Sequence, residues 1–287
     1  MNLKDRLFTD NKTKSRFNYN EWCFENKIHE LVGIPIDEKA EINSKITKSL
    51  YKAVDPNNLI PFPPELDDLT RLHFFIRNRK VTTILEFGLG KSTIVFADAI
   101  AKNKKDYGDY ISTNLRRSNA FEIHSIDNSK NWIDLSKNNF PEHLKEHVTF
   151  YLSDVEMTTF NDRICTMYKK LPNICPDLIY LDGPEQFNVI GDVRGVSTAS
   201  TDRIPMSADI LIIEPFLLPG TLIITDGRTA NARFLLNNLQ RNWEYCHFVK
   251  EDIHAFELVE KPLGEINERQ LDFCNTKIEN ENLNNKK

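Results

Sequence analysis

The sequence predicts an α/β protein with a doubly wound, mostly parallel, seven-stranded sheet that ends in a C-terminal antiparallel hairpin. From residue 82 onward, short apolar runs alternate with segments of helical periodicity. The runs are continuously apolar, which is typical of parallel strands covered on both faces. The last two runs, Glu244–Val249 and His254–Val259, are joined only by residues 250–253. A parallel pair needs a longer crossover, so these two strands must be antiparallel.

The predicted order of elements starts after Pro61–Pro64, a segment that no helix can cross. Leu66, Leu69 and Leu72 then recur at helical spacing. Helices are expected at Glu65–Arg79, Ser92–Ala101, Asn131–Asn138, Asp162–Lys170, Ser207–Leu217 and Ala230–Leu239. Strands before the hairpin are expected at Thr82–Phe87, Phe121–Ile126, Val148–Leu152, Asp177–Leu181 and Thr221–Thr225. The long polar segment 186–206 interrupts this alternation, and we expect a substrate lid there.

Two flanking regions lie outside this alternation. Residues 1–64 are predicted to form a helical or irregular extension, with helices at Glu21–Leu31 and Ile42–Val54. Residues 65–262 then form the sheet domain. Residues 263–287 are expected to be a partly disordered tail, because Asn, Lys and Glu dominate from Asn275 onward.

Composition bounds the class of protein. The chain has 287 residues, with 37 Lys+Arg against 42 Asp+Glu, a net charge of −5 and 40% hydrophobic residues. These values are ordinary for one large domain, or for one domain with an appendage. The mildly acidic balance argues against a broad nucleic-acid-binding surface. No apolar run approaches the roughly 20 residues of a membrane helix. We therefore expect neither a nucleic acid nor a membrane as a partner.

The start of the chain and its cysteines indicate a cytoplasmic protein. Residues 1–17 contain no apolar segment of the kind that a secretory signal needs. The five cysteines are Cys23, Cys165, Cys175, Cys246 and Cys274. None of them form a CxxC spacing, and an odd, scattered set favours reduced, mostly buried thiols.

Acidic residues lie at or near the end of each parallel strand. They are Glu86, Asp127, Asp154, Asp182 and Asp226. In an open α/β sheet the ligand binds at the carboxyl ends of the strands, so these side chains are candidates for a single site. Asp is also common at helix N-caps, which is the alternative for any single one of them.

The first strand leads into a glycine turn, Gly88-Leu89-Gly90-Lys91-Ser92-Thr93. A Walker A loop would need its first glycine at Leu85, and a dinucleotide fingerprint would need its third at Thr93. Both of these phosphate-binding motifs therefore fit only in part.

A third motif fits better. The segment Ile84–Thr93 resembles motif I of the class I S-adenosylmethionine (SAM)-dependent methyltransferases, which have a Rossmann-like fold. That motif runs apolar, apolar, acid, apolar, Gly, x, Gly, x, Ser/Thr. The resemblance extends over residues 65–258, because it includes the element order, the acid ending the second strand and the closing hairpin. It is nearest to the small-molecule O-methyltransferases, and it implies that residues 65–262 form a SAM-binding methyltransferase domain.

The resemblance implies a role for each strand-tip residue. Gly88 and Gly90 allow a close approach of the backbone. Glu86 would meet the ammonium group of the cofactor, with a buried structural hydrogen bond as its alternative. Asp127 would accept the ribose hydroxyls. Asp154 would face the adenine amine, or cap a helix. The predicted cofactor-binding residues are Glu86, Gly88, Gly90, Ser92, Asp127, Asp154 and Asp182.

The predicted catalytic residues are Asp182, Asp226 and Arg228. In the catechol-type O-methyltransferases, acids at these two strand ends and an adjacent Asn hold a divalent ion. Here Gly227 occupies the Asn position, so a divalent metal is the less favoured alternative and no metal ligands are assigned. Without a metal, Asp182 could act as the general base, and Arg228 could orient an anionic or polyhydroxyl substrate.

These features favour O-methylation of a small polar metabolite or sugar. No Asn/Asp-Pro-Pro-Tyr/Phe motif follows the fourth strand, where many N-methyltransferases carry one. The alternatives are an NAD-type oxidoreductase on a Rossmann domain, which Thr93 and the hairpin disfavour, and a non-catalytic homologue that binds the cofactor.

Overall fold

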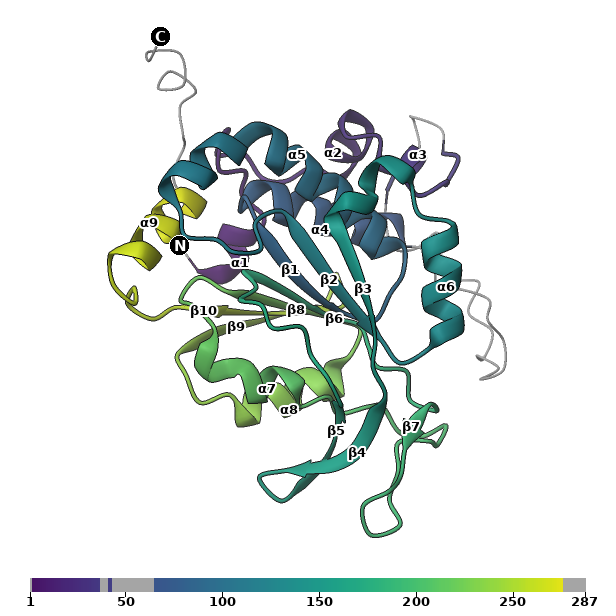
Figure 1. Cartoon of the computed structure of the whole chain (residues 1–287). Helices are drawn as coiled ribbons and strands as arrows, with labels where there is room; N and C mark the ends of the chain where they lie inside the picture. Colours follow the sequence, from purple (N-terminus) through teal and green to yellow (C-terminus); the bar gives the residue numbers. More distant parts are fainter. Residues whose placement is uncertain (1, 37–40, 43–64, 276–287) are drawn as a thin grey trace.

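A computed structural model describes residues 2–36, 41–42 and 65–275 of the chain. Its centre is a seven-stranded sheet in the order β3-β2-β1-β6-β8-β10-β9 (Figure 1). The parallel strands are β1 Thr83–Phe87, β2 Glu122–Asp127, β3 Val148–Leu152, β6 Leu178–Leu181 and β8 Leu222–Asp226. The antiparallel hairpin is β9 Trp243–Phe248 and β10 Ile253–Leu258, and β10 also pairs with β8. The predicted fold class is confirmed, and this strand order is that of the Rossmann-like methyltransferase fold.

Helices cover both faces of the sheet (Figure 1). On one side lie α4 Leu66–Asn78 and α5 Lys91–Asn114, which pack on the sheet through an apolar cluster containing Phe75 and Phe96. On the other side lie α7 Asp209–Ile213 and α8 Thr229–Asn238, with a second cluster containing Ile210 and Leu235. Connecting elements are α6 Lys130–Asn138 and the 3-10 helices η2 Glu142–His147 and η3 Glu214–Phe216. The helix predicted to end at Ala101 runs on to Asn114.

One predicted helix is wrong. The segment Asp162–Lys170 contains a strand, β5 Arg163–Tyr168, which pairs antiparallel with β4 Val155–Phe160. Asn161 and Asp162 join them with φ angles of 48° and 62°. Positive φ at both residues is what a two-residue type I′ hairpin turn requires, and Asn and Asp adopt it more readily than most residues. A hairpin therefore takes the place of the expected crossover helix.

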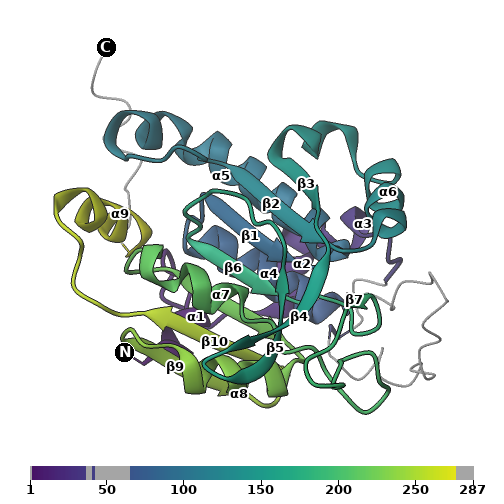
Figure 2. The same cartoon turned by 60° about the horizontal axis from the view of Figure 1, so that its bottom comes forward.

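The hairpin forms a small second sheet, in the order β5-β4-β7, with β7 Val189–Ile190. Figure 2 shows these three strands together beside the main sheet. β7 belongs to the segment 186–206, which is thereby held along β4. The amide of Asn128 also donates to the backbone oxygen of Asn188 at 2.9 Å.

The N-terminal segment packs on the sheet domain. It contains α1 Leu3–Leu7, α2 Tyr19–Glu25 and α3 Ile28–Leu31. Phe8, just after α1, stacks edge-on against Phe75 of α4, with ring centroids 5.3 Å apart. The predicted helix Ile42–Val54 lies outside the described residues, apart from Ile42.

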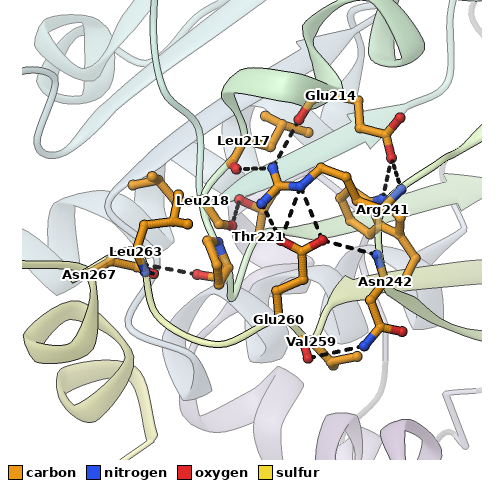
Figure 3. Close-up of polar contacts among 12 residues, drawn as sticks. Glu214, Leu217, Leu218, Thr221, Arg241, Asn242, Val259, Glu260, Leu263 and Asn267 are labelled. Atoms are coloured by element: carbon orange, nitrogen blue, oxygen red, sulfur yellow. Dashed lines mark hydrogen bonds and ion pairs between the residues drawn. The ribbon is translucent and has the colours of Figure 1, made fainter.

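Polar contacts anchor the connection from α8 to β9 (Figure 3). This connection lies at the end of the sheet opposite the carboxyl ends of the parallel strands. Arg241 forms an ion pair with Glu260 at 2.6 Å and donates to the backbone oxygens of Leu217 and Glu214. The Glu214 carboxylate accepts the Trp243 indole N–H at 2.8 Å. These contacts link η3 to the start of β9 and to the segment that follows β10.

The C-terminal region begins with a helix, α9 Glu265–Asn275. Phe273 is buried and packs against Tyr107 and Tyr110 of α5. The expected disorder after Asn275 concerns residues 276–287, which lie outside the described residues. No helix in residues 2–36, 41–42 and 65–275 is both long and apolar enough to span a bilayer. All five cysteines are free thiols.

A buried carboxylate joins the starts of β1 and β6. Asp177 accepts the backbone N–H groups of Thr82 at 3.0 Å and Thr83 at 2.7 Å, and the Thr82 hydroxyl at 2.9 Å. The Arg117 guanidinium lies 3.3 Å from the same carboxylate. Asp177 therefore satisfies polar groups that would otherwise be buried without partners.

We expect the replacement Asp177→Asn to lower the free energy of unfolding by about 3–5 kcal/mol, because it breaks a buried ion pair and removes an acceptor. Urea unfolding followed by circular dichroism measures this. Asp154→Asn is the matched control: its carboxylate is exposed and forms a surface ion pair with Lys169, so it should change stability by less than about 1 kcal/mol. Equal losses in the two variants would contradict this interpretation.

Candidate functional site

The glycine turn after β1 packs directly against the turn after β6. Gly88 has φ of +91°, and a Cβ atom there would lie 3.0 Å from the backbone carbon of Asp182. A Cβ atom on Gly183 would lie 2.6 Å from the Gly88 nitrogen. Both positions therefore require glycine. Gly90 differs, because a Cβ atom there would meet only Ser92 atoms at 3.7 Å and beyond, so this residue leaves the start of α5 open.

Glu86 is fully buried in β1, behind the turn. Its carboxylate accepts the hydroxyls of Ser92 at 2.7 Å, Thr93 at 2.8 Å and Ser125 at 2.5 Å. Burial raises the pKa of Glu86 to about 7, and the three hydroxyl donors oppose this rise. These bonds match the alternative expected for Glu86, a buried carboxylate with structural hydrogen bonds. Glu86 does not line the adjacent cavity.

A cavity of about 740 Å³ opens at the carboxyl end of the sheet. Its walls come from the first turn of α4, the start of α5, the face of α6, and the ends of β6, β8 and the β9–β10 turn. The polar and aromatic side chains in these walls belong to Glu65, Asp68, Lys91, Ser92, Thr93, Trp132, Ser136, Asn139, Phe140, Tyr180, Asp182, Asp226 and Asp252. Of the predicted site residues, Gly90, Ser92, Asp182 and Asp226 thus meet in one cavity.

Asp182 and Asp226 have different partners. The side chain of Asp182 is 54% exposed, and its Oδ1 lies 3.5 Å from Nε of Arg228. Arg228 also donates to the backbone oxygens of Asp182 and Pro184, and it does not line the cavity. The Asp226 carboxylate accepts the Tyr180 hydroxyl at 2.9 Å.

The electrostatics of the two acids differ accordingly. Desolvation, and then the neighbouring Asp182 carboxylate, raises the pKa of Asp226 to about 7. Desolvation also raises the pKa of Asp182, but the Arg228 guanidinium opposes that rise. Tyr180 is buried, and its pKa lies well above the usual value because of desolvation and the nearby acids. The phenol therefore stays protonated and acts as a hydrogen-bond donor.

Glu86 and Gly88 do not line the cavity, and two more of the predicted cofactor residues, Asp127 and Asp154, also lie outside its walls. Asp127, at the end of β2, is buried, and its carboxylate accepts the Ser129 N–H at 2.7 Å. Burial raises the pKa of Asp127 to about 6. Asp154 is exposed and pairs with Lys169 at 3.4 Å. The segment 186–206, expected to be a substrate lid, contributes none of the residues that line this cavity.

Sequence reasoning missed several residues of the cavity. Tyr180 lies two positions before Asp182 in a buried strand, where a polar aromatic side chain was the available signal. Trp132 lies five positions after Asp127 and donates its indole N–H to the Leu89 oxygen at 2.7 Å. Glu65, Asp68 and Asp252 carry no sequence signal, because they reach the site only through tertiary packing.

The strand-tip acids do not fit a divalent metal. Gly227 provides no side-chain ligand, and the amide of Asn231, one turn later, is bonded to the backbone of Ser207. Across residues 2–36, 41–42 and 65–275, only one group of three acid, His or Cys ligand atoms lies within 4.8 Å of one another. That group, at the start of α4, is Glu65, Asp67 and Asp68. Asp182 and Asp226 therefore lack a third ligand of these types.

Comparisons with known proteins give distant similarities. No family model matches the chain, and no curated protein matches it. A methyltransferase of Podospora anserina, solved with S-adenosylhomocysteine (SAH), is 14% identical with a TM-score of 0.39, over 69% of this chain and 80% of that one. An O-methyltransferase from Bacillus cereus in complex with SAH is 13% identical with a TM-score of 0.38, over 85% and 100% of the two chains.

A third similar structure is the O-methyltransferase TomG of Streptomyces achromogenes, involved in tomaymycin synthesis and solved with SAM. It is 13% identical with a TM-score of 0.36, over 91% of this chain and 97% of that one. Likenesses this weak do not establish an activity for this chain, so the function has to be inferred from the site.

The raised pKa of Glu86 gives a testable pH dependence. Between pH 4.5 and about 7 the folded state holds a proton on Glu86 that the unfolded state has lost. This contribution therefore favours folding at low pH and is lost as the pH rises through this window. We expect the unfolding free energy of wild type relative to Glu86→Gln to fall by about 3 kcal/mol from pH 4.5 to 7.

Urea unfolding at a series of pH values checks this expectation. The difference between the two proteins isolates Glu86, because other buried acids contribute equally to both. Glu142→Gln is the control, since it removes an exposed carboxylate. If the difference in unfolding free energy between wild type and Glu86→Gln does not change with pH, the three hydroxyls hold Glu86 at its usual pKa.

Proposed function

We propose that the chain is a SAM-dependent O-methyltransferase that acts on a small polar metabolite or sugar. One observation carries the proposal: a cavity of about 740 Å³ joins the glycine turn and the start of α5 to two strand-tip carboxylates. In a doubly wound sheet the ligand binds at this edge, where the strand order reverses. The volume lies within the roughly 300–1,000 Å³ that small-molecule sites occupy.

The wall of the cavity suits the parts of the cofactor. The first N–H groups of α5, beside Gly90, favour the methionyl carboxylate. The half-exposed carboxylate of Asp182 favours the positive sulfonium. The half-buried indole of Trp132 offers an apolar face for the adenosine. Asp127, beside the same turn, is proposed to accept the ribose hydroxyls.

Two of the residues proposed to bind the cofactor already have partners in the chain. Glu86 is enclosed by three hydroxyls, so it would act on the ammonium through Ser92, which lines the cavity. Asp154 would have to leave Lys169 to reach the adenine amine. The proposal therefore depends chiefly on Gly88, Gly90 and Asp182.

The chemistry needs few groups. The methyl group of a sulfonium is already activated, so the protein has to align the acceptor oxygen, the methyl carbon and the sulfur. A hydroxyl acceptor must also lose its proton. Asp182 and Asp226 place carboxylates at the site where this proton would be released, and a positioned base of this kind accelerates proton transfer.

The charge of the cavity favours uncharged or cationic acceptors. Five carboxylates line it, from Glu65, Asp68, Asp182, Asp226 and Asp252. In the described part of the chain, Lys91 is the only lysine or arginine among the lining residues. An anionic acceptor would be repelled. Arg228, predicted to orient an anionic or polyhydroxyl substrate, is engaged by Asp182 and Pro184.

Binding of SAH tests the cofactor. At a concentration one hundred times its Kd, SAH should add about 2.7 kcal/mol of stability and raise the melting temperature, whereas NADH should not. Trp132→Leu should weaken SAH binding at least about tenfold in calorimetry, because it removes an aromatic face. Trp22→Leu is the matched control, since Trp22 packs against His73 and Phe74 on α4. Stabilisation by NADH alone would contradict the proposal.

An acceptor series tests the substrate class. SAH formation should be faster with a neutral sugar or phenol than with its phosphorylated counterpart, by about tenfold at low salt. The difference should shrink as salt is added, because ions screen the carboxylates. Faster methylation of the phosphorylated acceptors would exclude this assignment.

A further inference from the structure

Tyr180 and Arg228 contact different acids at the strand ends. Tyr180 bonds to Asp226, and Arg228 pairs with Asp182. Tyr180 stands on β6, beside Glu86 of β1 and Ile224 of β8 in the sheet register. Its ring is held edge-on by Phe96 of α5, with centroids 5.3 Å apart. The buried side chain therefore has little freedom, and its hydroxyl is directed at the Asp226 carboxylate at 2.9 Å.

Arg228 holds the other acid. Its side chain is 17% exposed and contacts the Asp182 carboxylate, the Asp182 backbone oxygen and the Pro184 backbone oxygen. A guanidinium beside a carboxylate favours the ionised form. No cation of this kind contacts the Asp226 carboxylate directly among the described residues, where the direct contact is the neutral Tyr180 hydroxyl. Two acids in one cavity with unlike partners are suited to unlike roles.

We propose that Asp226 is the general base of methyl transfer, that Tyr180 positions it, and that Arg228 favours the ionised form of Asp182, which faces the sulfonium. This inference rests on the proposed function. It replaces Asp182 as the expected base, and it adds Tyr180, which the sequence did not single out, as a positioning residue. Among the described residues, a guanidinium contacts Asp182 directly but none contacts Asp226, so Asp226 is the carboxylate more able to gain a proton.

Methyl transfer moves one proton and breaks one carbon–sulfur bond. The acceptor O–H proton moves to the Asp226 carboxylate as a lone pair of the oxygen forms a bond to the methyl carbon. The carbon–sulfur bond breaks, and its electron pair stays on sulfur, which leaves as the neutral thioether of SAH. Asp226 then releases the proton to solvent before the next turnover.

Several charged groups face Asp226 and tune its titration. Asp182 and Glu65 raise its pKa, and Arg71 and the Tyr180 hydroxyl lower it. Asp68, paired with Arg71, and Asp252 line the same cavity. The resulting pKa of about 7 lets Asp226 act as a base at neutral pH. Since the base must be ionised, the rate should rise as the pH increases through this value.

The experiment follows the Asp226 carboxyl by carbon-13 NMR in the full chain, with aspartate labelled and the resonance assigned by its loss in Asp226→Asn. It should titrate near pH 7 in wild type. In Tyr180→Phe the midpoint should rise by about one pH unit, because a hydrogen bond to the charged form is lost. In Asp182→Asn it should fall, because the neighbouring negative charge is removed. Tyr110→Phe, on the far end of α5, is the matched control and should leave it unchanged.

The same variants are assayed for the pH dependence of kcat with a neutral hydroxyl acceptor, and for SAH binding by calorimetry. The midpoint of the rise of kcat on the acid side, its acid limb, should move with the NMR midpoint. It should move to higher pH in Tyr180→Phe and to lower pH in Asp182→Asn. Tyr180→Phe should keep its SAH affinity. A midpoint that moves while the acid limb stays fixed overturns Asp226 as the base. So does an Asp226→Asn variant that retains wild-type kcat. A midpoint that Tyr180→Phe does not move removes Tyr180 from the mechanism.

Failure of the proposed function gives a different result. A wild-type chain that neither binds SAH nor releases it from SAM overturns the methyltransferase itself, and with it the assignment of a base. A wild-type chain that does both while the Asp226 tests fail overturns only this inference. If Tyr180→Phe does not fold, the opposite shift in Asp182→Asn still decides the role of Asp226.

Discussion

The site depends on a backbone contact between two turns. The turns after β1 and β6 approach so closely that Gly183 has no space for a Cβ atom against the Gly88 nitrogen. The backbone N–H of Asp182 also bonds to the Phe87 oxygen at 2.9 Å, which continues the β1–β6 ladder into the turns. Asp182 and the start of α5 are both placed by this contact, one on each side of it. The Asp182 carboxylate and the start of α5 together frame the cavity. A larger residue at either glycine would move them apart.

Two acids near this contact, Glu86 of β1 and Asp226 of β8, are satisfied by the chain in different ways. Glu86 is enclosed by hydroxyls that come from α5 and β2. Asp226 has one hydroxyl donor and opens into the cavity. A carboxylate enclosed by donors from the chain serves the fold, whereas one that opens into a cavity can exchange a proton with a ligand. This distinction separates a structural acid from a candidate catalytic one more clearly than burial does.

The sequence predicted the fold well because each parallel strand is a short apolar run that ends at or near an acid or glycine. This signal is local, so it can be read from neighbouring residues alone. It failed at residues 162–170, where the turn Asn161-Asp162 was not recognised and helical periodicity was assigned to a hairpin strand. Glu86, Gly88 and Asp182 could be selected because they follow or end strands. Asp68 and Asp252 could not, because their place in the cavity depends on how α4 and the hairpin pack. Tyr180 had only the signal of a polar aromatic residue in a buried strand, and that signal does not reveal its contact with Asp226.

The β1–β6 pair is closed at both of its ends. At the carboxyl end the two glycine turns are in contact, and at the other end Asp177 binds the backbone of Thr82 and Thr83. Opening this pair locally would break the glycine packing and the Asp177 contacts together, so its amide hydrogens should exchange only when the whole domain unfolds. The central strands consequently act as a rigid reference for the site. Motions that admit a ligand must come from parts attached to one side of it, such as α4, α6 and the β9–β10 turn.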